Sequence, residues 1–80
     1  MSVYNVEIFD RTARRVIDRR TAHSERKASE VAKSFIDAAK RKLNITDEST
    51  YDISPRGFII GQTLVAGDAV FQISTGIMKQ

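Results

Sequence analysis

The chain has 80 residues, of which 41% are hydrophobic and 29% charged, and its formal net charge is +3. This length suits one small domain (1–80), and the composition favours a globular fold over a disordered tail. The absence of cysteine excludes disulfides and thiolate zinc sites. The longest apolar run, 58–60, is far too short to span a membrane, and residues 1–7 lack the features of a signal peptide. We therefore expect a cytoplasmic domain that does not bind membranes.

Charge is distributed unevenly along the chain. Residues 1–45 carry eleven Lys and Arg against six Asp and Glu, whereas residues 46–80 carry two against four. Five arginines fall within 11–20, where Asp18 is the only acidic residue. In a small domain, this segregation indicates a basic face directed at an acidic partner.

The first predicted elements are two strands that form a hairpin. Apolar and polar side chains alternate along 3–9, which is typical of a strand. The segment 10–13 is a turn candidate, and 14–21 is the returning strand because it is rich in β-branched residues. A short helix capped by Asp10 is the alternative for this second segment. The apolar face of the first strand consists of Tyr4, Val6 and Ile8.

A helix is predicted over 25–43, because its apolar residues recur every three and four positions on one stripe. Ser24 is the expected N-cap, and the basic residues 40–42 suit the negative end of the helix dipole. Asn44 is expected to end the helix in the left-handed conformation. The stripe comprises Ala28, Val31, Ala32, Phe35, Ile36, Ala39 and Leu43.

A polar loop at 46–49 and then three strands are predicted after the helix. Turns at 55–57 and 66–68, each containing glycine, separate the strands. The fold class is therefore α+β: an antiparallel sheet of four to five strands, built as β-hairpin, one long helix and β-meander, with the helix packed on one face. The three predicted strands are 50–54, 58–65 and 69–74.

The predicted strands also carry apolar residues on the face turned away from the helix. One helix covers one side of a sheet, and an apolar patch left open on a small protein marks an interface. A two-fold homodimer would cover this patch. The alternatives are a different protein partner, or coverage by sheet curvature and the chain termini. The residues predicted on this apolar sheet face are Val3, Phe9, Ile59 and Val65.

Patterns typical of catalytic and metal sites are nearly absent. His23 is the only histidine. Its neighbour Ser24 forms a nucleophile–base pair with it only if the fold places the two side chains within hydrogen-bonding reach and supplies an acid that orients the histidine. One histidine with scattered carboxylates matches no usual metal-ligand spacing. Gly57 and Gly61 lack the Lys-Ser/Thr ending of a phosphate-binding loop. We expect no enzyme activity, no catalytic residue, no metal and no cofactor.

The arginine-rich segment 11–20 is the strongest functional signal, because the planar arginine fork suits carboxylate and phosphate. A solvated edge strand whose charges prevent aggregation is the other interpretation. The first hypothesis is a non-enzymatic protein-binding module, a small regulator or inhibitor of a protein with an acidic surface. The alternative is a nucleic-acid-binding module that contacts phosphates through 11–20. The candidate basic face comprises Arg11, Arg14, Arg15, Arg19, Arg20, Lys33, Lys40 and Arg41.

Overall fold

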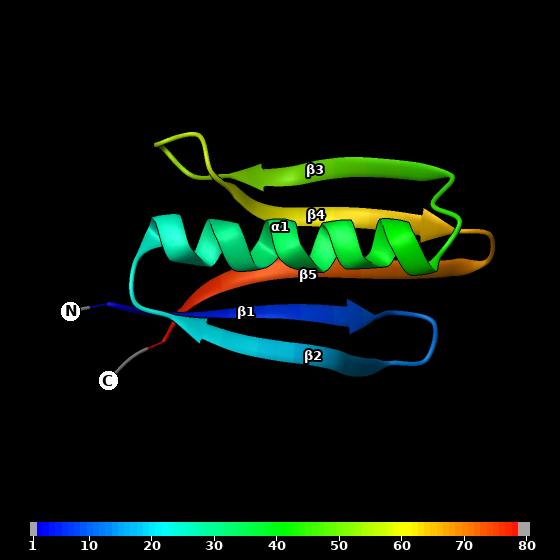
Figure 1. The fold of residues 1–80 in the computed structure, drawn as a ribbon, viewed down its shortest axis with the longest axis horizontal. Helices are drawn as coiled ribbons and strands as arrows, with labels where there is room; N and C mark the ends of the chain where they lie inside the picture. Colours follow the sequence, from blue (N-terminus) through cyan, green and yellow to red (C-terminus); the bar gives the residue numbers. More distant parts are fainter. Residues whose placement is uncertain (1, 79–80) are drawn as a thin grey trace.

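The computed structural model describes residues 2–78, which form five strands and one helix. All five strands belong to one antiparallel sheet with the order β2-β1-β5-β4-β3. The helix lies across one face of this sheet (Figure 1). The predicted α+β architecture of hairpin, helix and meander is confirmed. In chain order the elements are β1 (Val3–Asp10), β2 (Arg15–Ala22), α1 (Glu25–Lys42), β3 (Asp47–Ile53), β4 (Ile59–Ala66) and β5 (Ala69–Met78).

The last strand, β5, lies in the middle of the sheet between β1 and β4. The prediction that this strand ends at residue 74 is wrong, because β5 continues to Met78. It pairs with β1 along its whole length, from Val3 opposite Met78 to Asp10 opposite Phe71. This pairing supplies the extra length and joins the N-terminal hairpin to the C-terminal meander in one sheet.

The helix begins where the sequence predicts. The Oγ atom of Ser24 accepts a hydrogen bond from the backbone N–H of Lys27 at 3.1 Å, as expected of an N-cap. The expected left-handed C-cap at Asn44 is wrong. Leu43 is the C-cap, with an extended backbone, and its N–H donates to the carbonyl of Ala39 at 2.8 Å. Among residues 2–78, Arg14 is the only residue other than glycine that has a positive φ, so Asn44 is not left-handed.

The chain leaves the helix in an extended conformation because the next strand begins at once. The backbone N–H of Thr46 donates to the carbonyl of Val65 at 2.8 Å, which aligns the chain with β4. The predicted loop at 46–49 is therefore wrong, since β3 begins at Asp47. All seven residues of β3 are exposed, and α1 packs against the other four strands but not against β3. The first residues of β3 are polar and exposed, so no apolar alternation in the sequence reveals where this strand begins.

The hydrophobic core lies between α1 and the sheet. Val6, Leu64 and Ile73, from three neighbouring strands, are completely buried, and the helix covers them with Phe35 and Ile36. The predicted helical stripe is confirmed, except that Val31 is only partly buried and Leu43 is 37% exposed at the helix end. The buried residues of the stripe are Ala28, Ala32, Phe35, Ile36 and Ala39.

Candidate functional site

The arginines of β2 project from both faces of the sheet. Neighbouring residues in a strand point to opposite sides, so Arg19 and Arg20 cannot act on one surface. Arg19 lies on the face away from the helix, where its Nε is 2.9 Å from Oε1 of Glu7. Arg20 lies on the helix face, with its guanidinium 5.8 Å from the ring centre of Phe35. The segment therefore supplies no continuous row of arginines.

The other arginines of the segment lie at the hairpin end. Arg11 and Arg14 are in the exposed turn between β1 and β2, and Arg15 opens β2 opposite Asp10. The carboxylate of Asp10 accepts two backbone N–H groups of the turn, at 2.9 and 3.0 Å, and so stabilises it. This turn lies at the same end of the molecule as the C-terminus of α1, which carries the exposed Arg41 (Figure 1).

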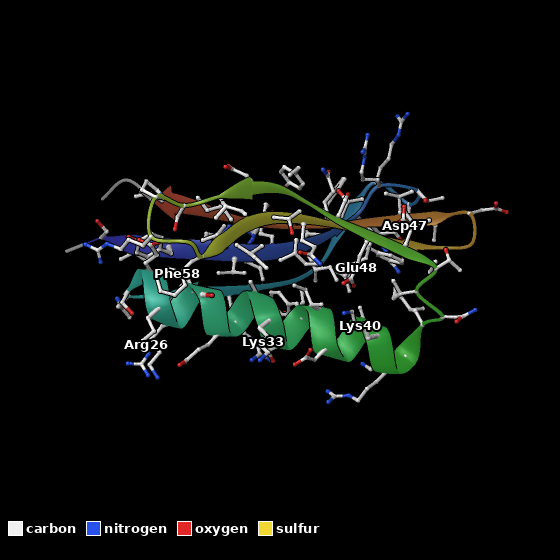
Figure 2. All side chains as sticks on the ribbon, turned by 90° about the horizontal axis from the view of Figure 1, so that it is seen from above. Arg26, Lys33, Lys40, Asp47, Glu48 and Phe58 are labelled. Atoms are coloured by element: carbon white, nitrogen blue, oxygen red, sulfur yellow. The ribbon has the colours of Figure 1, made fainter. Side chains whose placement is uncertain are left out.

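The predicted helix lysines lie along a groove between α1 and the strands β3 and β4. Lys33 and Lys40 both line this lateral groove, which has a volume of about 420 Å³. Nζ of Lys40 is 2.8 Å from Oε2 of Glu48, and this ion pair bridges the helix to β3 (Figure 2). In the sheet wall, the hydroxyl of Thr50 donates to Oε1 of the buried Gln62 at 3.0 Å. The lateral groove is therefore polar and crossed by a charged pair.

The four residues predicted on the apolar sheet face lie apart. Val3 and Phe9 are at opposite ends of β1, and the polar residues Asn5 and Glu7 lie between them on the same face. Ile59 lines cavities on the helix side of the sheet. The middle of this sheet face is consequently polar.

A smaller apolar area remains at the hairpin end of that face. Phe9 pairs with Val16 of β2, and Val65 pairs with Val70 of β5. Gln72 lies beside Phe9 in the next strand and separates the two pairs. Each pair thus joins one of the four predicted residues to a valine that the prediction did not include.

An apolar pocket that the sequence analysis did not identify lies at the N-terminal end of α1. This N-terminal pocket has a volume of about 390 Å³ and is lined by residues from β1, the first turns of α1, the β3–β4 loop, β4 and β5. Its apolar wall consists mainly of Tyr4, Phe58, Ile60 and Ile77. Figure 2 shows Phe58 beside the start of the helix. Ile77 is 68% exposed, more than any other large hydrophobic residue among those described.

The hydroxyl groups of Ser54 and Thr75, two residues that line the N-terminal pocket, differ in their hydrogen bonding. Oγ of Ser54 donates to Oε1 of Glu25 at 2.5 Å and accepts the N–H of Phe58 at 3.1 Å, which ties the β3–β4 loop to the helix. Oγ1 of Thr75 is buried and has no hydrogen-bond partner within the described residues. An unpaired buried hydroxyl group costs free energy.

The signal that could have identified this pocket is the continued alternation of β5. Phe71 and Ile73 face the helix, and a period of two places Thr75 and Ile77 on the same side. Ending the predicted strand at residue 74 hid this relationship.

In the part of the chain that the structure describes, no group of three or more His, Cys, Asp or Glu side chains is arranged to hold a metal ion. No helix in residues 2–78 is both long and apolar enough to cross a membrane. His23 is exposed, and the hydroxyl oxygen of Ser24 is occupied by the helix cap.

Comparisons with protein-family models, curated proteins and solved structures each found no significant match.

Proposed function

We propose that the protein is a non-enzymatic protein-binding module that receives an apolar side chain of its partner in the N-terminal pocket. The supporting observation is the exposure of Ile77 at the rim of an apolar pocket. Exposed apolar surface on a small domain is typical of interaction sites, and a partner side chain inserted into such a pocket supplies much of the binding energy of an interface.

The chemistry of the pocket favours an aromatic anchor with one polar atom. Tyr4, Phe58 and Ile60 offer an apolar wall, and the hydroxyl-bearing residues Ser29 and Thr75 line the same pocket. Tyrosine and tryptophan combine a large apolar body with a single polar group, and both are enriched at interfaces. A partner presenting one of these residues fits the pocket best.

Affinity capture from the native host, followed by calorimetry with the purified captured protein, tests the proposal. The test variant is Ile77→Lys, which places a charge at the pocket rim. The matched control is Leu43→Lys, because Leu43 is an exposed apolar residue at the C-cap of α1, the other end of the helix. We expect the first variant to weaken direct binding at least about tenfold and the second to leave binding unchanged. Equal affinity of wild type and Ile77→Lys would disprove use of the pocket.

A second candidate function is binding of nucleic acid through the hairpin end. It is favoured by the position of Arg11 and Arg14 in an exposed turn, at the same end of the molecule as Arg41. The same residues would serve a protein partner with an acidic surface. Duplex DNA binding measured across salt concentrations tests this function, because phosphate neutralisation makes affinity fall linearly with log salt. Absence of binding at low salt would exclude it.

A further inference from the structure

The two edges of the sheet carry opposite charge. β2 and β3 are the outermost strands, and every residue on them is exposed except Ala22. Charges on edge strands normally prevent one sheet from joining another. In this protein, like charges make two β2 edges repel each other, and likewise two β3 edges. A β2 edge and a β3 edge attract each other, because their charges are opposite. The charged residues are Arg15, Asp18, Arg19 and Arg20 on β2, and Asp47, Glu48 and Asp52 on β3.

The same two strands expose apolar side chains. Val16 and Ile17 of β2 are 38% and 49% exposed, and Tyr51 and Ile53 of β3 are 52% and 57% exposed. These are four of the six large hydrophobic residues that are exposed in the described chain. These exposed apolar side chains indicate that the two edges form contacts, because a strand that serves only as a solvated edge does not require them.

The apolar and charged residues of β2 and β3 follow orders that match when the two strands are aligned antiparallel. β2 is apolar near its start, at Val16 and Ile17, and basic near its end. β3 is acidic at its start and apolar near its end, at Tyr51 and Ile53. Antiparallel pairing therefore brings the apolar parts together and places the arginine pair 19–20 opposite the acidic pair 47–48.

We propose that β2 of one copy pairs antiparallel with β3 of a second copy, so that the protein associates head to tail through its sheet edges. Within one sheet, β2 and β3 run in the same direction, because each strand is antiparallel to its neighbour. The second copy must therefore be turned over, with its helix on the opposite face. Such a contact leaves one free edge at each end, which allows growth beyond a dimer. It does not involve the N-terminal pocket.

Two intramolecular ion pairs limit the charge that the edges present. Arg19 is bound by the partly buried Glu7, and Glu48 is bound by Lys40, with both side chains of the second pair exposed. Ion pairs at the protein surface are weak and exchange readily. Arg20, whose guanidinium lies over the ring of Phe35, and Asp47 form no ion pair within the described residues, so no neighbouring charge neutralises them.

Sedimentation velocity over a range of protein concentrations tests the proposal. We expect the mean mass of the wild type to rise with concentration at low salt and to fall when salt screens the edges. The β2 variant Arg19→Glu/Arg20→Glu and the β3 variant Asp47→Lys/Glu48→Lys should each associate about tenfold more weakly, because each makes both edges alike in charge. Arg26→Glu/Lys27→Glu, a double charge reversal on α1 outside the edges, should associate like the wild type.

Mixing the two reversal variants gives the decisive result. One variant then has two acidic edges and the other two basic edges, so an equal mixture should recover the wild-type association. Thermal unfolding of each variant checks that it folds, and the salt dependence of the wild type tests the proposal without any substitution. A wild type that remains monomeric up to about 1 mM at low salt, or a mixture that fails to associate, would overturn the proposal.

Discussion

The ring of Tyr51 lies against Gly61 on the neighbouring strand, where any other residue would carry its Cβ. The pairing of β3 with β4 shifts here, because Thr50 is opposite Gln62 and Asp52 is opposite Gly61. Tyr51 is thus the extra residue of a bulge, and its ring covers the backbone of β4 on the face away from the helix. This contact explains why a glycine occupies the interior of a strand, where glycine is otherwise unfavourable.

Gly61→Ala tests this contact. The added methyl group overlaps the ring of Tyr51, so we expect the free energy of unfolding to fall by about 1–3 kcal/mol. In a Tyr51→Ala background, the same substitution should be neutral or slightly stabilising, because alanine suits a strand better than glycine. Chemical denaturation of the four proteins gives the coupling between the two residues. An equal effect of Gly61→Ala in both backgrounds would show that the ring does not need the glycine.

The phenol of Tyr51 should make stability depend on alkaline pH. Partial burial raises its pKa, and the adjacent carboxylate of Asp52 raises it further. The folded state therefore holds the phenol proton more tightly than the unfolded chain does, in which tyrosine titrates at about pH 10. Its contribution to stability is complete below that pH and is lost as pH rises through it toward the raised pKa.

Thermal unfolding between about pH 9 and 11 measures this effect, with Tyr51→Phe as the control. The Tm of the wild type should fall more steeply with pH than the Tm of the variant. Parallel curves would show that Tyr51 does not titrate differently in the folded state.

Phe35→Ala should remove most of the stability of the fold. Phe35 is 6% exposed and packs between α1 and the sheet, so its truncation should cost about 3–5 kcal/mol. A domain of this size has on the order of 4–12 kcal/mol in total. Lys33→Ala, at an exposed position of the same helix, serves as the control and should unfold like the wild type. A Phe35→Ala protein with a Tm close to that of the wild type would contradict the packing described.

Ser24→Ala should destabilise the protein by about 1 kcal/mol, because it removes the acceptor for the backbone N–H of Lys27. The matched control is Ser34→Ala, since Ser34 lies exposed in the middle of the same helix and alanine has the higher helix propensity. Urea denaturation should therefore separate the two serines, with a lower midpoint for the first variant only. Equal midpoints would show that the cap contributes nothing.

The elements with one buried and one exposed face could be predicted from the sequence. The stripe of α1 and the alternation of Tyr4, Val6 and Ile8 in β1 are local patterns, and burial on one side imposes them. The start of β3 at Asp47 and the end of β5 at Met78 were not predicted. β3 begins where the chain pairs with β4, and its exposed side chains leave no periodic pattern there. The alternation of β5 does continue through Ile77, but only the pairing with β1 shows that the strand extends to Met78.

The candidate sites could likewise be predicted only where a local sequence pattern indicates them. Basic residues could be recognised one by one, but the pleat of β2 separates Arg19 from Arg20. The N-terminal pocket joins Tyr4, Phe58 and Ile77, which come from distant parts of the chain. No local pattern connects these three residues, because β5 must first pair with β1 to bring them together.

The sequence by itself determined the composition of the two charged strands, including the arginines of β2 and the carboxylates of β3. Only the tertiary structure decided that these strands are the opposite edges of one sheet. The physical reason is the insertion of β5 between β1 and β4, since its backbone hydrogen bonds occupy the inner edges of both hairpins. The outer edges, β2 and β3, are consequently left free with opposite charge.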